Sequence, residues 1–244
     1  MSITAILNGF RRPQHIQMQI NHILNQTVKP EEIWLWRNYH EDWNIELPTL
    51  QGVDKYCESN YNWKYFGRFS LAMMARTEFV AFFDDDTIPG NMWFENCVNT
   101  HSQVNGILGG VGLVHHNDNQ YTDHTRFGWP SYNEQVVKVD LVGHAWFVKK
   151  DYLRYVWFEE PVTYETGEDM HLSYICQKYG NIETFVPPHP KSNLEMSSSL
   201  YGYELGTDDK TDSVVNHAAF VPLRNNCFRG YVKRGWKLLY NVGD

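Results

Sequence analysis

The sequence predicts one α/β domain with a central, mostly parallel β-sheet flanked by helices. Residues 3–7 and 31–36 are short apolar stretches separated by a segment with helical spacing, which indicates a βαβ unit with parallel strands. Residues 79–83 form an unbroken apolar run that is typical of a strand buried on both faces. The length of 244 residues suits a single domain of this class.

Composition and charge argue against several classes of protein. The formal net charge of −8 argues against a nucleic-acid-binding domain, which needs a basic surface. The four cysteines are widely separated, which favours buried free thiols over a zinc knuckle or a disulfide framework. The first strand begins too early for a signal peptide, and no apolar run approaches the ~20 residues that span a membrane. We therefore expect a soluble, cytoplasmic protein without a nucleic-acid partner.

The first βαβ unit places polar residues at one edge of the predicted sheet. The first strand ends at Asn8, a helix is predicted to end near residue 24, and the second strand ends near Asn38. Because parallel strands end at the same edge, we expect Asn8, Arg11 and Asn38 to lie near one another. They are either nucleotide ligands or ordinary turn residues.

The next stretch is less regular. Residues 40–62 are polar and aromatic without a clear period, and 69–76 is a candidate helix that leads into the apolar strand. Arg68 stands just before this helix, and its planar, permanently charged guanidinium suits the oxygens of a diphosphate. An exposed arginine at a helix start is the alternative.

Three consecutive carboxylates, Asp84, Asp85 and Asp86, follow the apolar strand directly. The carboxyl end of a parallel strand is where open α/β sheets bind ligands, and adjacent like charges are unfavourable unless a cation neutralises them. Hard divalent cations prefer carboxylate oxygen, so we predict a metal site. A solvated acidic turn or a phosphatase-type aspartyl nucleophile is the alternative. An EF-hand fails, because Pro89 stands where its turn glycine must be.

The segment after the triplet alternates between regular and irregular stretches. The patterns predict a helix over 89–99, a short helix beginning at 149–151, and strands over 106–114, 136–141 and 145–148. Between the last two strands, a glycine at position 143 allows close backbone approach. Residues 115–130 form a polar insert with three histidines, which we expect to be a loop that contacts the acceptor rather than a metal site.

Glu168 and Asp169 form a second acidic group, at the start of a predicted helix. Apolar residues over 172–179 keep helical spacing, and Gly180 ends the helix. Acids at a helix N-terminus are stabilised by the helix dipole alone. A carboxylate held rigidly there, opposite a metal site from another strand, is also how a general base is placed. Both interpretations stay open.

The last part of the chain contains three further features. Residues 185–190 predict a final strand and a rigid turn that presents His189, whose imidazole could complete the coordination of Mn²⁺. Residues 192–216 are predicted to be a mobile lid. Residues 221–243 contain no acid and predict a packed, basic amphipathic helix, with a face that could contact a phosphate or an anionic membrane surface.

These motifs resemble those of GT-A type glycosyltransferases of the family-two-like kind, with some likeness to the exostosin-like transferases. The resemblance spans roughly residues 3–190 and rests on Asn8-Gly9 and Arg11-Arg12-Pro13, on the Phe82-Phe83-Asp84-Asp85-Asp86 form of the Asp-x-Asp motif, and on Gly167-Glu168-Asp169 as the Glu-Asp motif. The sequence has no Gln-x-x-Arg-Trp motif, which processive polysaccharide synthases of this group carry. A single-addition transferase is therefore expected.

The resemblance implies a Rossmann-like GT-A domain and a role for each matched residue. Asp84 and Asp85 would contact the donor's ribose and the metal environment, and Asp86 would coordinate the Mn²⁺ or Mg²⁺ that bridges the diphosphate. Asp169, beside Glu168, would deprotonate the acceptor hydroxyl. A base at Asp169 implies inversion, whereas the exostosin-like enzymes retain configuration, so the stereochemistry stays open.

The predicted function is metal-dependent transfer of one sugar from a UDP- or GDP-linked donor to a hydroxyl of a saccharide or glycoconjugate. The nucleotide-sugar half would span about 1–110, the acceptor half about 111–190, and the mobile loop with the basic C-terminal helix about 191–244. A catalytically inactive carbohydrate- or nucleotide-binding protein of the same fold is one alternative. A metal-dependent sugar nucleotidyltransferase is another, although residues 8–12 match its glycine-rich phosphate loop poorly.

Overall fold

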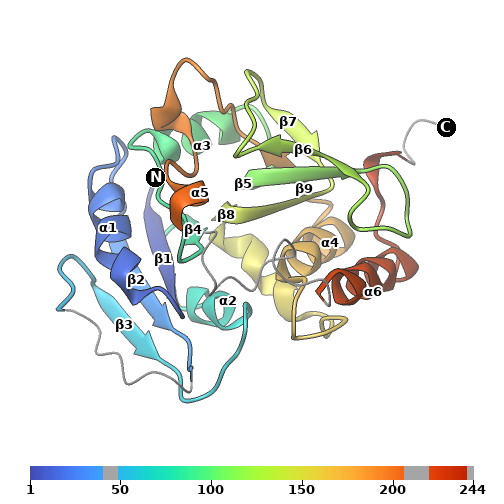
Figure 1. The fold of residues 1–244 in the computed structure, drawn as a ribbon, viewed down its shortest axis with the longest axis horizontal. Coiled ribbons are helices and arrows are strands. Elements are labelled where there is room, and N and C mark those ends of the chain that lie inside the picture. Colours follow the sequence, from blue (N-terminus) through green and yellow to red (C-terminus); the bar gives the residue numbers. More distant parts are fainter. Residues whose placement is uncertain (41–48, 206–219, 241–244) are drawn as a thin grey trace.

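The computed structural model describes residues 1–40, 49–205 and 220–240. Within these ranges the chain forms a nine-stranded sheet with helices on both faces (Figure 1). The strands lie in the order β3-β2-β1-β4-β8-β5-β9-β7, and β6 pairs with β5. The predicted α/β class with a central sheet flanked by helices is confirmed.

The first half of the sheet is parallel. β1 (Ile3–Gly9) pairs with β2 (Glu32–Arg37) on one side and with β4 (Phe79–Phe83) on the other, and α1 (Pro13–Leu24) connects β1 to β2. This is the predicted βαβ unit. β3 (Lys55–Glu58) adds an edge beyond β2, in the stretch that shows no clear period. Its residues are mostly exposed, so a short edge strand of this kind carries no apolar pattern.

The second half of the sheet is built around β8 (Leu141–Lys149), which is antiparallel to both β4 and β5 (Gly106–His115). The strand continues through Gly143, where the sequence predicted an interruption. β9 (Glu183–Val186) runs parallel to β5, and β7 (Val137–Val139) pairs with β9 at the edge. The sheet is therefore mixed, with its parallel region at β3-β2-β1-β4.

The polar insert over 115–130 contains a strand that the sequence analysis missed. β6 (His124–Gly128) pairs antiparallel with β5. Its side chains are mostly polar and partly exposed, so no alternation marks it as a strand. The expectation of an irregular loop across the whole insert is wrong, and the turn after β6 becomes part of a cavity described below.

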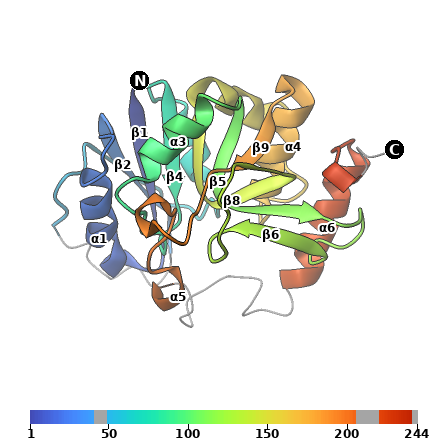
Figure 2. The same cartoon turned by 90° about the horizontal axis from the view of Figure 1, so that it is seen from above.

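Alternate residues of the central strands pack into two separate cores. On β1, Ile3, Ala5 and Leu7 belong to the core beneath α1 and α3 (Trp93–His101), whereas Ile6 belongs to the core on the opposite face. Figure 2 shows these two helices on one side of the sheet and α4 on the other. Because helices cover both faces, both sets of alternate residues are apolar, which explains the unbroken apolar run of β4. The helix predicted over 89–99 begins only at Trp93.

The opposite layer consists of α2 (Gly67–Ala72), the 3-10 helix η1 (Lys150–Trp157), α4 (Glu168–Gly180) and α6 (Phe220–Lys233). α6 contributes Cys227, Phe228 and Tyr231 to this core, and all three are fully buried. The C-terminal helix is thus packed into the domain, as its amphipathic pattern predicted. None of the helices in the described ranges is long and apolar enough to cross a membrane.

Residues 191–205, which include η2 (Leu194–Met196) and α5 (Gly202–Leu205), are anchored to the turn that precedes α3. Gly90 N donates to Ser197 O at 3.0 Å, and Leu200 N donates to Ile88 O at 2.8 Å. The lid predicted over 192–216 therefore begins with a segment bonded to the body of the domain. The part of that prediction beyond residue 205 lies outside the described residues.

Candidate functional site

The carboxylate triplet lies at the carboxyl end of β4, between β1 and β8. All five residues of β4 are buried, while Asp84, Asp85 and Asp86 are partly exposed. Asp84 N donates to His144 O at 3.3 Å, and Thr87 Oγ1 donates to the same carbonyl at 3.1 Å. β8 therefore fixes the turn that carries the triplet at the parallel edge of the sheet.

Two buried arginines compensate much of the triplet's charge. Arg12 Nη1 lies 2.7 Å from Asp85 Oδ1 and 3.6 Å from Asp86 Oδ2, and Arg68 Nη1 lies 2.6 Å from Asp84 Oδ1. Arg12 is 4% exposed and Arg68 is 1% exposed. A metal ion is therefore not the only cation that can balance the three carboxylates, because the protein supplies two guanidinium groups of its own.

The compensation is nevertheless partial. Burial and the neighbouring carboxylates raise the pKa of Asp85 and of Asp86 to about 6, and burial is the larger cause for both. Arg12 opposes both shifts. An additional cation at this edge would therefore stabilise the ionised carboxylates.

Three side chains at this edge could hold a metal ion. Asp84, Asp86 and His144 each offer a ligand atom, and these atoms lie within 4.8 Å of one another. His144 comes from β8 with a φ of 71°, and its ring stacks on Trp129 at 4.6 Å and 11°. Burial lowers the pKa of His144 to about 4, so the imidazole is neutral and keeps a lone pair. Two carboxylates and an imidazole suit Mn²⁺, so the donor set fits a divalent cation.

His189, the histidine predicted to complete this coordination, lies outside the group of three. It is 2% exposed, with Nδ1 at 2.8 Å from Pro187 O and Nε2 at 3.3 Å from Ser198 Oγ. Among the described residues, His144 stands where the sequence analysis expected His189. The sequence pattern cannot distinguish the two, because the register of β8 against β4 decides which imidazole reaches the triplet.

Glu168 and Asp169 begin α4, and Gly167 before them has a φ of 82°. Arg68 connects this pair to the triplet, because its Nη2 lies 3.4 Å from Glu168 Oε1 while its Nη1 contacts Asp84. The two acidic groups, which are far apart in the chain, therefore meet at one buried guanidinium. Such a planar, permanently charged side chain can hold two carboxylates in fixed positions.

Asp169 is paired with Arg224 of α6, a residue that the sequence analysis assigned only to the basic tail. Arg224 Nη2 lies 2.5 Å from Asp169 Oδ2 and 2.7 Å from the hydroxyl of Tyr121. Burial disfavours the charged guanidinium, but Asp169 and its neighbours outweigh burial and raise the pKa of Arg224. Asp169 Oδ1 accepts a hydrogen bond from Met170 N at 2.9 Å. Both carboxylate oxygens of Asp169 therefore have partners.

Glu168 is in a different state from its neighbour. Burial, reinforced by the charge of Asp169, raises the pKa of Glu168 to about 8 despite the opposing effect of Arg68. Its Oε2 has no hydrogen-bond partner in the described part of the chain. At neutral pH the pair thus combines an arginine-bound carboxylate with a protonated acid that has a free oxygen. Two neighbouring acids in such different surroundings can take different roles in proton transfer.

A cavity of about 210 Å³ joins the two acidic groups. Asp84 of the triplet and His144 of β8 line this cavity. Glu168 and Asp169 of α4 and Arg224 of α6 line it as well. The rest of its wall is largely aromatic and comprises Tyr65, Tyr121, Gly143, Trp146, Thr166 and Phe220. A ligand in this cavity would contact both acidic groups at once.

The other residues predicted to bind the nucleotide differ in their exposure and in the hydrogen bonds of their side chains. Asn38 is 2% exposed, and its side-chain amide is hydrogen-bonded to the loop at 62–64. Arg11 Nε donates to a histidine ring at 3.1 Å, and it is Arg12 that contacts the triplet. Asn8 is partly exposed near the end of β1. These placements favour turn chemistry for Asn38 and leave ligand roles for Asn8 and Arg11 as predictions.

Comparison with known proteins shows the fold class. No family model and no curated protein matches the chain. Solved structures do match it, and they support a glycosyltransferase fold. The likeness does not reach the level of the GT-A family or of the exostosin-like transferases, so that finer resemblance stays a prediction.

The matching structures include three of the glycosyltransferase TarS from S. aureus. TarS 1–349 is 14% identical with a TM-score of 0.52, and the match covers 78% of this chain and 61% of that one. TarS 1–349 in complex with UDP is 16% identical with a TM-score of 0.53, covering 77% and 58%. A longer TarS structure is 15% identical with a TM-score of 0.52, covering 77% and 37%. The chain thus spans less than two thirds of each, and the likeness establishes the fold alone.

Proposed function

We propose that this protein is a glycosyltransferase that moves one sugar from a nucleotide-diphosphate sugar to a hydroxyl acceptor. The observation that carries the proposal is the convergence of the triplet and the Glu168–Asp169 pair on one cavity at the carboxyl edge of the sheet. A TarS structure of similar fold holds UDP, which supports a nucleotide donor here.

The donor diphosphate would lie against the triplet. Asp84, Asp86 and His144 would hold Mn²⁺ or Mg²⁺, with His189 as the alternative third ligand. When bound, this ion would offset the negative charge that grows on the departing nucleotide diphosphate. Arg12 would orient Asp85 and Asp86 through its contacts at 2.7 and 3.6 Å.

Asp169 would accept the proton of the acceptor hydroxyl. Arg224 Nη2 lies 2.5 Å from Asp169 Oδ2, so the hydroxyl must compete with Arg224 for this oxygen. Glu168 is protonated at neutral pH, and its unpaired Oε2 can donate a hydrogen bond to a sugar in the cavity. The two acids therefore divide into a proton acceptor and a hydrogen-bond donor.

The Arg224–Asp169 contact also favours a second candidate, a binding protein of the same fold without turnover. An acid that only anchors a helix needs no free oxygen, and both oxygens of Asp169 are bonded. The two candidates differ in one measurable property. A transferase releases nucleoside diphosphate from a sugar donor when an acceptor is added, and a binding protein does not.

Calorimetric titration with UDP and with GDP tests the donor site. The titrations are made with Mn²⁺ and again with EDTA, on the wild type, on Asp86→Ala, and on Asp118→Ala as a matched control with an exposed aspartate. We expect Mn²⁺-dependent binding of one nucleotide that weakens by about tenfold or more in Asp86→Ala and is unchanged in the control. Absence of nucleotide binding under every metal condition would refute the proposal.

A further inference from the structure

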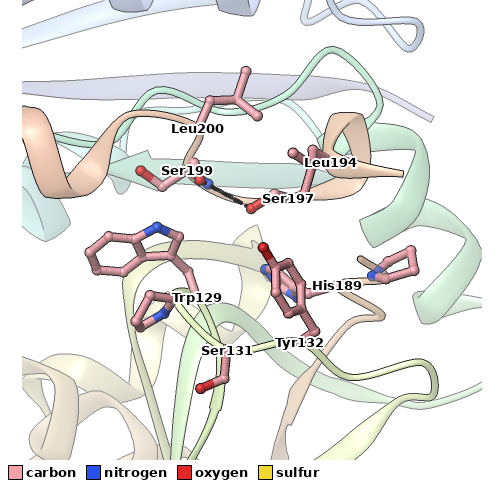
Figure 3. Close-up of a pocket in the computed structure, with 10 residues that line it drawn as sticks. Trp129, Ser131, Tyr132, His189, Leu194, Ser197, Ser199 and Leu200 are labelled. Atoms are coloured by element: carbon pink, nitrogen blue, oxygen red, sulfur yellow. Dashed lines mark hydrogen bonds between the residues drawn. The ribbon is translucent and has the colours of Figure 1, made fainter. Parts of the chain in front are cut away.

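A second cavity, of about 160 Å³, is lined by residues of 129–132, 189–190 and 194–200. Three segments form it, namely the turn after β6, the turn after β9 and the segment around η2 (Figure 3). Its lining comprises Trp129, Pro130, Ser131, Tyr132, His189, Pro190, Leu194, Ser197, Ser199 and Leu200. None of the strands that carry the triplet contributes to it.

The lining indicates a neutral ligand. It combines aromatic surface from Trp129 and Tyr132 with serine hydroxyls, and no Asp, Glu, Lys or Arg belongs to it within the described ranges. His189 lines the cavity as a side chain that is 2% exposed, with Nδ1 at 2.8 Å from Pro187 O and Nε2 at 3.3 Å from Ser198 Oγ. A diphosphate would find no cation in such a cavity, whereas an aromatic face beside hydroxyl groups suits the C–H and O–H surfaces of a sugar ring.

Ser199 lines this cavity and has an unsatisfied hydroxyl group. It is 3% exposed, and its Oγ has no hydrogen-bond partner among the residues that the structure describes. The neighbouring Ser197 Oγ, by contrast, donates to Ser199 O at 3.1 Å and accepts from Ser199 N at 3.3 Å. In Figure 3 Ser199 lies beside the Trp129 ring. A ligand hydroxyl that reached this oxygen would supply the hydrogen-bond partner that it lacks.

The cavity shares a wall with the candidate metal site. Trp129 lines it, and the same indole stacks on His144, which lines the cavity of the two acidic groups. A molecule bound here is therefore separated from the triplet by one pair of stacked rings. The reacting hydroxyl of the acceptor must lie in the cavity of Asp169, so a ring bound behind these two side chains would be a further ring of the same acceptor.

We propose that this second cavity binds one neutral sugar ring of the acceptor, with Tyr132 as an aromatic wall and Ser199 Oγ as a hydrogen-bond partner. Its volume is below the ~300–1,000 Å³ of typical drug-sized sites, which suits a single ring. The inference rests on the proposed transferase function and adds the location and the class of the acceptor group.

Saturation-transfer difference NMR tests this assignment with the methyl β-glycosides of glucose, galactose and N-acetylglucosamine as probes. We expect at least one glycoside to bind the wild type, and Ser199→Ala and Tyr132→Ala each to weaken that binding by about three- to tenfold. Tyr179→Ala is the matched control, because Tyr179 is an exposed tyrosine on α4 outside both cavities. It should bind like the wild type.

The assignment is overturned if no glycoside binds the wild type. It is also overturned if both cavity variants bind the glycoside as tightly as the wild type does. Displacement of the glycoside by uridine would also overturn it, since that result assigns the cavity to a nucleobase. Calorimetry with UDP and GDP on the same variants should show unchanged nucleotide affinity. The proposed transferase function fails if the wild type binds no nucleotide in this titration. The cavity assignment fails in the glycoside experiment, so the two failures are distinguishable.

Discussion

The two acidic groups of the site are built in different ways. The triplet continues directly from one buried strand, and Arg12, which contacts it, follows the neighbouring strand. The Glu168–Asp169 pair instead takes its partners from α2 and α6, which are distant in sequence from α4 and from each other. The triplet thus depends on strand pairing, while the helix pair depends on the packing of three helices.

The same structural difference underlies the separate roles that we propose for the two groups. The triplet combines carboxylates with a neutral imidazole at the sheet edge, which suits binding of a cation and a diphosphate. The helix pair combines a protonated acid with an arginine-bound carboxylate, which suits proton transfer and positioning. Changes to the triplet should therefore alter donor binding, and changes to the helix pair should alter turnover or the stability of the fold.

The largest effect is expected for Asp169→Asn. The amide keeps the shape of the side chain but cannot accept a proton, so kcat should fall by about 10²–10⁴-fold. Donor affinity should be unchanged, because the triplet is intact. Steady-state release of nucleoside diphosphate measures the rate, with Asp118→Asn as the control. A variant that keeps the wild-type rate would exclude Asp169 as the base.

The buried ion pair predicts a large effect on stability. Arg224→Met leaves Asp169 buried without its cation, and the free energy of unfolding should fall by about 3–5 kcal/mol. Arg229→Met on the same helix should cost at most about 1 kcal/mol, because the bonds of Arg229 are exposed. Urea denaturation measures both. Equal midpoints for the two variants would show that Arg224 does not anchor α6 to the site.

A comparison of two histidines sharpens the assignment of the metal ligands. His144→Gln should weaken Mn²⁺-dependent nucleotide binding by about tenfold or more, because His144 lies within the candidate donor set. His189→Gln should leave that binding unchanged if its bonds to Pro187 and Ser198 describe its role. Calorimetry measures the nucleotide affinity of both variants, and thermal unfolding shows whether each variant is folded. The opposite pattern would assign the third ligand to His189.

The last effect concerns pH. The pKa of Glu168 is raised from 4.5 to about 8 on folding, so between these values the folded state binds a proton that the unfolded state has lost. Stability from this group is therefore lost as pH rises through that window. Glu168→Gln resembles the protonated form and should gain stability relative to the wild type from pH 4.5 to pH 8. Parallel stability curves for the two proteins would contradict the raised pKa.

The sequence predicts most of this fold and about half of the site. β1, α1, β2, β4 and α4 are predictable because their apolar residues have simple periods and are covered by other elements. β3 and β6 are missed because they are short and largely exposed. At the site, both acidic groups are contiguous motifs and can be found by inspection.

The remaining site residues cannot be found in this way. His144 reaches the triplet through the register of β8 against β4, and Arg224 reaches Asp169 through the packing of α6 on α4. Arg12 and Arg11 are adjacent, and only the path of the chain after β1 decides which of them contacts the triplet. Tertiary structure determines these choices, and no local pattern in one sequence encodes them.

The most direct test of the claim that both acidic groups form one site is a crystal structure with Mn²⁺ and the nucleotide that binds. An anomalous-difference map identifies the ion by its own scattering. We expect an anomalous peak in contact with Asp86. The diphosphate of the bound nucleotide should lie beside this peak and face the cavity of Glu168 and Asp169. An ion away from the triplet, or a nucleotide bound outside this edge of the sheet, would contradict it.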